Sequence, residues 1–293
     1  MIQYLHCPVC SSDNIAEVLT AIDHTVSHEQ FKVWQCNSCT LRFTQSVPEE
    51  SEIGRYYKST DYISHSDIKK GLINNLYHQV RNITLKQKKN LVEKKAGLAT
   101  GSILDVGSGT GSFLSVMAAS GWKVIGLEPD AEARKLAQQK GLYVEATNQL
   151  FKLPVSSFDA ITMWHVLEHV HELHKYMDQI KALLKPNGLL FIAVPNYTSG
   201  DANYYGSNWA AYDVPRHLYH FSPVSMNALI AKHDLRTIDT IPMWFDSFYI
   251  SMLSEKYKKG NIISALLQGV LSNLKTVSEH QRCSSLIYVI KPS

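Results

Sequence analysis

The sequence predicts an α/β fold in which helices cover both faces of a mostly parallel β-sheet, with a small separate module in front of it. After Gly101, short apolar runs typical of buried strands alternate with amphipathic stretches typical of helices, which indicates a parallel sheet. Four of the five cysteines lie within the first 39 residues, which sets the N-terminal part of the chain apart. The length of 293 residues allows one large domain and one small one.

The composition excludes several classes of protein. Hydrophobic residues make up 45% of the chain and charged residues 19%, as in ordinary globular proteins. A formal net charge of +3 is too small to indicate a nucleic-acid partner by itself. The N-terminus, MIQYLHCPVC, lacks the basic region and apolar core of a secretory signal, and no apolar run approaches the ~18 residues of a membrane span. We therefore expect a cytoplasmic protein with no membrane span, in which thiols stay reduced.

The cysteines form two closely spaced pairs that suit one metal ion. Cys7-Pro-Val-Cys10 and Cys36-Asn-Ser-Cys39 can supply four thiolates to a tetrahedral zinc ion, and such a closed set indicates a structural site. A module of this size needs such a staple because its own core is small. The apolar stretches at 31–34 and 41–43 suit the short strands of a zinc ribbon, so we assign residues 1–45 to this module. The alternative is free thiols or a redox pair; Cys283 stands apart and is expected to be inert.

Residues 46–95 are predicted to connect the module to the large domain. The stretch 46–66 is polar and rich in tyrosine. From Asp67 an amphipathic helix is indicated by apolar residues at every third or fourth position, namely Ile68, Leu72, Leu76, Val80 and Ile83. The lysines at the end of this helix are interpreted as a solvated face.

The large domain, residues 96–293, is predicted from its alternating elements. Strands are expected at 102–107, 123–129, 143–147, 158–166, 189–195, 235–241 and 284–291. Helices are expected at 112–121, 131–141, 172–185 and 222–234. The third helix should end at the Pro-Asn-Gly of 186–188, and the fourth should begin with Ser222 as N-cap and Pro223 in the first turn. The last two strands suit an antiparallel, hairpin-like addition at the edge of the sheet.

A glycine-rich turn follows the first strand of the large domain. In ILDVGSGTGSFL, residues 103–114, the glycines are Gly107, Gly109 and Gly111. A dinucleotide-binding turn would have glycine at 112, where the chain has Ser112, and a phosphate-binding P-loop would have a lysine in reach. Glycines here let the backbone approach a ligand. Glu128 ends the next strand, where an acid can accept hydrogen bonds from both ribose hydroxyls of a nucleoside.

Three stretches together resemble class I S-adenosylmethionine-dependent methyltransferases: ILDVGSGTGSFL, VIGLEPD and SFDAITMWHVLEHV. They occur in the family's order and spacing, and the resemblance covers about residues 95–293. It implies a Rossmann-like, mostly parallel seven-stranded sheet that binds S-adenosylmethionine. It also implies a cofactor site made of Asp105, Gly107, Ser108, Gly109, Gly111, Glu128, Pro129, Asn148 and Trp164. Many relatives have an acid near the adenine where this chain has Asn148.

The acceptor is expected beyond the fourth strand, because ligands in open α/β sheets sit at the carboxyl ends of the strands. There the chain reads Trp164-His165-Val166-Leu167-Glu168-His169. The [DN]-P-P-[FYW] motif of amine-methylating relatives is absent from this place. The string is similar to the E-x-x-E-H metal set of ubiquinone-type O-methyltransferases, with His165 in place of the first glutamate. Three interpretations stay open: His165 as base or orienter with Glu168 and His169 beside it, a divalent metal set of these three residues, or a structural role.

The segment 204–223, YYGSNWAAYDVPRHLYHFSP, is long for a connector and concentrates aromatic and charged residues. We expect it to act as a lid or binding loop that contacts a polar, ring-shaped or sugar-like acceptor. The acceptor-binding residues would be Trp209, Tyr212, Arg216, His217 and His220. The alternative is a segment that packs on its own aromatics. Its D-x-P-R-H-L-x-x-F-S pattern resembles methyltransferases of bacterial surface-polysaccharide and secondary-metabolite pathways.

These observations predict O- or C-methylation of a small molecule or glycan precursor. The alternative enzyme is an RNA methyltransferase that uses the zinc ribbon on nucleic acid, although the weak charge does not favour a nucleic-acid partner. A scaffold that binds the cofactor without transfer is a third hypothesis, against which the intact glycines argue. The apolar stretches at 241–253 and 261–271 suit an acceptor pocket, a dimer face or ordinary core.

Overall fold

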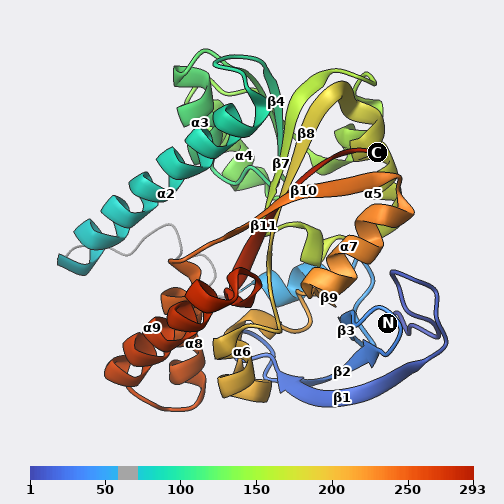
Figure 1. Cartoon of the computed structure of the whole chain (residues 1–293), viewed down its shortest axis with the longest axis vertical. Coiled ribbons are helices and arrows are strands. Elements are labelled where there is room, and N and C mark those ends of the chain that lie inside the picture. The colour runs from blue at the N-terminus through green and yellow to red at the C-terminus, as the bar shows by residue number, and fades with distance from the viewer. Residues whose placement is uncertain (59–71) are drawn as a thin grey trace.

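The computed structural model describes residues 1–58 and 72–293, with side chains from residue 80 onward in the second range. A seven-stranded sheet runs through the large domain in the order β10-β11-β8-β7-β4-β5-β6 (Figure 1). Its strands are β4 (Ser102–Val106), β5 (Lys123–Leu127), β6 (Val144–Glu145), β7 (Phe158–Trp164), β8 (Leu184–Pro195), β10 (Leu235–Pro242) and β11 (Ser285–Pro292). The predicted fold class, a Rossmann-like sheet with a small N-terminal sheet, is confirmed.

The sheet is parallel from β6 to β8 and antiparallel beyond. β11 pairs antiparallel with β8, and β10 pairs antiparallel with β11. The antiparallel edge was expected, but the two strands do not form a hairpin, because α8 (Asp246–Tyr257) and α9 (Ile262–Ser278) lie between them in the chain.

Helices cover both faces of the large sheet. Residues of α2 (Leu72–Ala96) and α3 (Ser112–Ala119) pack with one face of the central strands. Residues of α5 (Leu173–Leu183) and α7 (Pro223–Lys232) pack with the other face, while α4 (Ala131–Gln138) packs near β6. Strands covered on both sides are apolar throughout, as β8 is from Gly188 to Pro195. The helical stripe predicted from Asp67 continues into α2; Ile68 lies outside the described residues, as do the side chains of Leu72 and Leu76.

The end of α5 differs from the prediction. The helix ends at Leu183 and β8 begins at once at Leu184, so residues 186–188 belong to the strand. The pairing with β7 shifts from Phe158↔Leu184 to Ala160↔Leu189, so the register between the two strands is irregular here. Gly188 is required there, because a Cβ would lie 2.7 Å from the Phe158 carbonyl oxygen. The predicted start of α7 is confirmed, since the Ser222 hydroxyl caps the helix by accepting from the Ser225 N–H.

The N-terminal residues form a second, antiparallel sheet that the large domain completes. It contains β1 (Ile15–Ile22), β2 (Gln30–Cys36) and β3 (Arg42–Thr44), and its fourth strand is β9 (Tyr219–His220) from the segment after β8. One hydrophobic cluster runs from Val9, Leu41 and Phe43 to residues of the large sheet without a break. The boundary at residue 45 therefore stays a prediction, and the two parts share their core.

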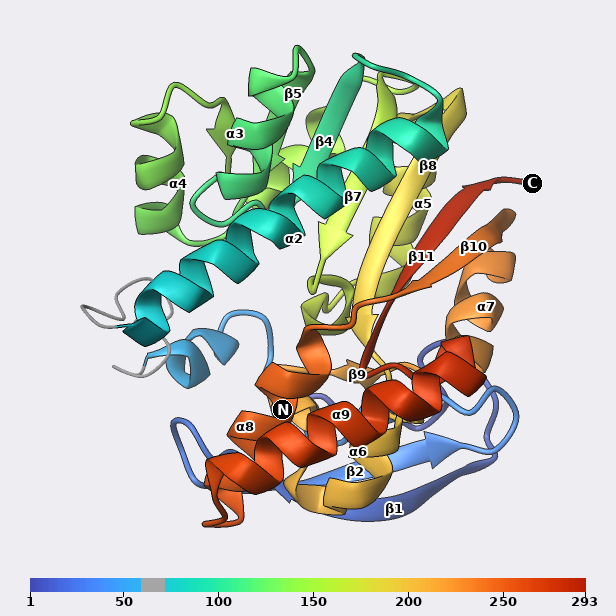
Figure 2. The ribbon, with the colours of Figure 1, turned by 60° about the vertical axis from the view of Figure 1, so that its left-hand side comes forward.

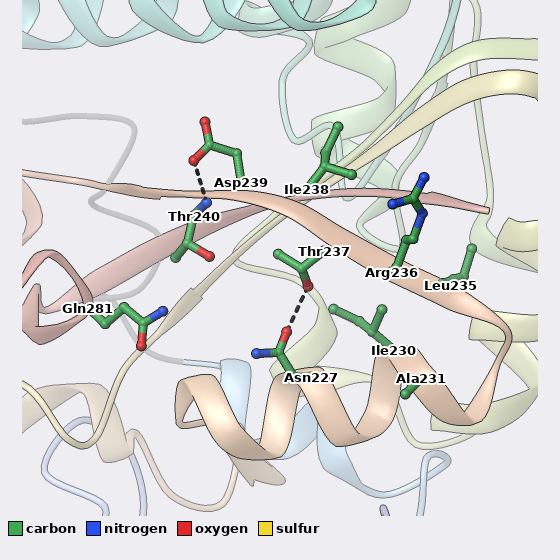
Figure 3. A pocket seen from close by; sticks show the side chains of 10 residues that line it. All are labelled: Asn227, Ile230, Ala231, Leu235, Arg236, Thr237, Ile238, Asp239, Thr240 and Gln281. Atoms are coloured by element: carbon green, nitrogen blue, oxygen red, sulfur yellow. Dashed lines mark hydrogen bonds between the residues drawn. The ribbon is translucent and has the colours of Figure 1, made fainter. Parts of the chain in front are cut away.

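Among residues 1–58 and 72–293, none of the helices combines the length and the hydropathy that a bilayer crossing requires. A hollow between α7 and β10 is lined by Asn227, Arg236 and Thr237 among others, with the Thr237 hydroxyl bonded to Asn227 (Figure 3). It lies at the β10 edge of the sheet, away from the glycine turn that follows β4.

Candidate active site

The glycine turn between β4 and α3 adopts left-handed backbone conformations at Gly107, Gly109 and Gly111, with φ of +73°, +54° and +74°. A side chain at Gly107 would lie 2.3 Å from Val166, and one at Gly111 would lie 2.4 Å from Leu142. A Cβ at Gly109 would instead meet nothing within 4 Å. The first and third glycines therefore serve close packing, and the second leaves open space for a ligand beside the backbone.

Glu128 closes the turn from the end of β5. Its carboxylate accepts hydrogen bonds from the Gly109 N–H at 2.8 Å and the Asp130 N–H at 3.0 Å. Burial raises the pKa of Glu128, and these two N–H groups oppose that rise. Pro129 and Asn148, both exposed, follow on the same side, with Asn148 in the 3₁₀ turn η3 (Thr147–Lys152).

Asp105, near the end of β4, is fully buried and accepts a hydrogen bond from the Thr162 hydroxyl at 2.6 Å. Burial raises the pKa of Asp105 to about 7. The Ser108 hydroxyl and the Trp164 indole N–H are buried near the turn without a hydrogen-bond partner among the described residues. Such polar groups are expected to find a partner when a ligand binds.

His165 follows β7 beside the glycine turn, since its neighbour Val166 packs against Gly107. Its Nε2 lies 3.1 Å from Asp246 at the start of α8, and its Nδ1 lies 3.4 Å from Glu168. Burial alone would lower the pKa of His165, but the two carboxylates outweigh burial and raise it to about 9. The imidazole is therefore charged at neutral pH in this arrangement.

Sequence reasoning missed Asp246. It is 81 positions beyond His165 (246 − 165) in a stretch that reads as apolar and aromatic, so no local pattern connects the two residues. Sequence reasoning also missed Lys88 of α2, whose ammonium lies 4.4 Å from the centre of the Trp164 ring. Burial lowers the pKa of Lys88, against the attraction of Asp246 and Asp105.

A second cluster lies behind His165 and consists of Glu168, His169 and His217. One ligand atom of each residue lies within 4.8 Å of the others, which is the geometry of a candidate metal site. Glu168 is completely buried, and neither carboxylate oxygen has a hydrogen-bond partner in the part of the chain that is described. The metal set expected from sequence, His165 with Glu168 and His169, stays a prediction; the structure brings His217 to Glu168 and His169, and places His165 between Glu168 and Asp246.

Both histidines of this cluster contact a backbone carbonyl oxygen through Nδ1. The Nδ1 atom of His169 lies 3.0 Å from the Arg216 carbonyl oxygen, and that of His217 lies 2.8 Å from the Ala211 carbonyl oxygen. Because a carbonyl oxygen only accepts, Nδ1 carries a proton in both rings. Burial and the neighbouring His217 lower the pKa of His169 to about 4, so its ring is neutral at pH 7.

The segment 204–220 does not present its predicted acceptor residues to solvent. The exposed fractions of Trp209, Tyr212, Arg216, His217 and His220 are between 1% and 9%. Polar atoms of four of these side chains have protein partners: Asp201 for Trp209, Arg42 for Tyr212, Ala211 for His217 and Thr44 for His220. This geometry matches the alternative expectation, a segment that packs on its own aromatics, because these side chains fill the space under the small sheet.

Arg216 is the most deeply engaged of these residues. Its guanidinium donates to Asp23 at 2.9 Å, to both oxygens of Asp213 at 2.7 and 3.0 Å, and to the Tyr56 carbonyl oxygen at 2.7 Å. Asp23 also accepts from the N–H groups of residues 25–27 and so shapes the turn between β1 and β2. Arg216 therefore links the small sheet to the segment before β9.

The four cysteines of the N-terminal module converge. Their sulfur atoms all lie within 4.8 Å of one another, with 3.5 Å between Cys7 and Cys39 and 3.5 Å between Cys10 and Cys36. In a tetrahedral zinc site with Zn–S bonds of about 2.3 Å, neighbouring sulfurs are about 3.8 Å apart, so the four residues fit the ion. Cys283 is buried elsewhere, beside β11.

The sheet order, the open glycine turn and the acid at the end of the next strand define a class I S-adenosylmethionine-dependent methyltransferase. A family model of the methyltransferase domain matches residues 77–240, more than half of the chain. The chain belongs to this family, and S-adenosylmethionine is its methyl donor.

Curated relatives and solved structures are more distant. An Actinobacillus pleuropneumoniae ubiquinone biosynthesis O-methyltransferase is 37% identical over 118 residues, which are 36% of this chain and 50% of that protein. A Brucella melitensis protein of the same name is 30% identical over 156 residues, 49% of this chain and 63% of that protein. The chain thus spans about half to two thirds of the length of these relatives. The Burkholderia thailandensis 1,6-didemethyltoxoflavin-N1-methyltransferase has a similar fold, with a TM-score of 0.52 and 15% identity over 93% of this chain and 100% of that one.

Replacing Arg216 tests whether this residue is structural. In Arg216→Ala the carboxylates of Asp23 and Asp213 lose their shared buried partner, so we expect a loss of about 3–5 kcal/mol in the free energy of unfolding. Urea denaturation measures this change. Arg216→Lys is the control that keeps the charge but loses the bidentate fork, and its loss should be smaller. Unchanged stability in Arg216→Ala would contradict the structural role.

Proposed function

We propose that this methyltransferase acts on a hydroxyl or carbon of a small molecule or glycan precursor. The observation that carries the proposal is His165, which sits beside the glycine turn with its ring between the carboxylates of Asp246 and Glu168. Such a histidine suits proton removal from an acceptor hydroxyl or carbon acid. The names of the distant curated relatives, ubiquinone biosynthesis O-methyltransferases, support oxygen as the acceptor atom.

The cofactor would lie along the turn from Asp105 to Gly111. The open space at Gly109 lets the backbone approach the cofactor, and Glu128 lies where it can accept from the ribose hydroxyls. The side chains of Asp105, Ser108 and Trp164 would complete the near wall, with Pro129 and Asn148 toward the adenine. When bound, S-adenosylmethionine supplies a methyl group on a positively charged sulfur, which is already activated for displacement.

The protein's part in the reaction is positioning and proton removal. His165 would take the proton that the acceptor hydroxyl loses when its oxygen receives the methyl group. Asp246 and Glu168 would stabilise the imidazolium that results, because both carboxylates are ionised. Burial acts to raise the pKa of each carboxylate, but the contact with His165 outweighs burial and lowers the pKa. The neutral His169 adds no positive charge that would compete.

Labelled methyl transfer tests the acceptor class. The protein is incubated with methyl-labelled S-adenosylmethionine and, separately, catechols, nucleotide sugars and total RNA. We expect label in a catechol or a nucleotide sugar and none in RNA. His165→Ala should lower the rate about 100-fold or more, because a positioned base contributes this much. Label in RNA alone, or full activity of His165→Ala, would reject the proposal.

The pH dependence of activity tests whether His165 acts as a base, because a merely structural histidine would not set this dependence. Below pH 9 the ring is protonated and cannot accept the acceptor's proton, so activity should rise with pH toward about 9 and then level. In Asp246→Asn the neutral amide no longer favours the charged ring, so the midpoint should move to lower pH. NMR titration of the His165 ring measures the midpoint without any acceptor, and an unmoved midpoint would contradict the pairing.

Two glycine substitutions separate cofactor binding from backbone strain. Gly109 and Gly141 both have positive φ, and an added Cβ meets nothing within 4 Å at either. Each change to alanine should cost about 1–2 kcal/mol of stability, the ordinary penalty of left-handed backbone. Gly109→Ala alone should also weaken binding of S-adenosylhomocysteine, roughly tenfold or more, because the methyl fills the ligand space. Calorimetry measures the affinity, and equal affinities in the two variants would disprove this placement.

We infer that Cys7, Cys10, Cys36 and Cys39 hold one structural zinc ion. Metal analysis should find about one zinc per chain, in line with a four-thiolate site. Cys36→Ser should lose the zinc and lower the thermal midpoint, because metal binding contributes to folding free energy. Cys283→Ser is the matched control, since this cysteine is also fully buried. Zinc that persists in Cys36→Ser, or is lost equally in Cys283→Ser, would exclude the assignment.

A further inference from the structure

The helix α9 has its small residues inside and its large aliphatic residues outside. The buried positions are Ala265, Gly269, Ser272 and Thr276, which recur at helical spacing. They allow close packing: a Cβ at Gly269 would lie 2.6 Å from the Phe248 ring of α8, and the Ser272 hydroxyl donates to Asp201 in α6 (Gly200–Tyr205). An ordinary surface helix has the opposite arrangement, with an apolar stripe facing the core.

The outward face of α9 is a continuous aliphatic surface. Its eight large residues are between 41% and 76% exposed: Ile262, Ile263, Leu266, Leu267, Val270, Leu271, Leu274 and Val277. The first half of α8 and the two residues before it also have exposed apolar side chains, at Trp244, Phe245, Tyr249 and Met252. Figure 2 shows α9 on the outside of the molecule, in front of α6 and α8. A contiguous apolar surface of this kind marks an interaction site.

The exposed charges within α8, α9 and the turn between them are positive, and the exposed Glu279 just after α9 is paired with Arg282. Residues 244–278 contain four lysines, Lys256, Lys258, Lys259 and Lys275, all of them exposed. The same stretch has two acids, and both point inward: Asp246 contacts His165, and Glu255 is 5% exposed and accepts from the Tyr205 hydroxyl. The face therefore presents aliphatic side chains and positive charge together.

We propose that α9, with the start of α8, docks this protein on the surface of a membrane that contains acidic lipids. Aliphatic side chains enter the boundary between headgroups and acyl chains, and flanking lysines attract anionic headgroups. A second copy of the chain fits this face less well, because pairing would bring two sets of four lysines together with no exposed acid from this stretch. At 17 residues α9 is about 25 Å long, so it lies along the surface and does not span it.

Vesicle flotation of the full chain tests the proposal. With 2:1 phosphatidylcholine:phosphatidylglycerol vesicles at low salt we expect the protein to float, and with phosphatidylcholine alone to float far less. Leu267→Glu with Leu274→Glu should abolish flotation. Lys259→Gln with Lys275→Gln should reduce partitioning about 25-fold, from roughly fivefold per lysine. Val155→Glu is the matched control, because Val155 is 67% exposed outside this face, and it should leave flotation unchanged.

Three results would overturn membrane docking. They are no flotation at low salt, equal flotation with and without the acidic lipid, and equal loss in Val155→Glu. Light scattering adds a fourth: a dimer that Leu267→Glu dissociates would show that a second copy covers the face. The lysine variant keeps the test valid should the glutamate variant fail to fold.

Discussion

The structure depends most on the buried guanidinium of Arg216. A buried charge is stable only when partners surround it, and here Asp23, Asp213 and the Tyr56 carbonyl do so at 2.7–3.0 Å. These partners come from three separate parts of the chain, so their positions are fixed together. The segment that contains Arg216 continues into β9 and completes the small sheet. It also places His217 beside Glu168. One buried ion cluster therefore fixes both the contact between the two sheets and the position of His217 near the active site.

Around the site, similar residues have different charge states because their surroundings differ. Burial raises the pKa of Asp105 to about 7, although the Thr162 hydrogen bond and the Lys88 charge oppose that rise, whereas Glu168 lies among three histidines and its pKa falls despite complete burial. His165 lies between two carboxylates and is charged, while His169 lies against His217 and is neutral. Paired environments of this kind are the usual basis of acid–base roles in active sites.

Much of the fold could be predicted because its signals are local. Hydrophobic periodicity located the strands and most helices, and the spacing of the four cysteines predicted the metal site that the sulfur positions fit. The glycine turn and Glu128 were found from sequence because they follow two consecutive strands and are close together along the chain. The roles assigned to them from family resemblance stay predictions. The irregular start of β8 before Gly188 was missed, since Pro-Asn-Gly is also a common helix ending.

What the sequence determined by itself is therefore the class of fold and the place of the cysteine cluster, which rest on short-range patterns, and the methyl donor, which rests on the resemblance of three short stretches to a known family. The tertiary structure decided that Asp246 faces His165, that His217 joins Glu168 and His169, and that Arg216 and Trp209 are buried. It also decided that the aliphatic side of α9 faces outward. An amphipathic pattern shows that a helix has two faces, but only packing determines which face is covered, because small residues pack as closely as large ones when the neighbouring helix fits them.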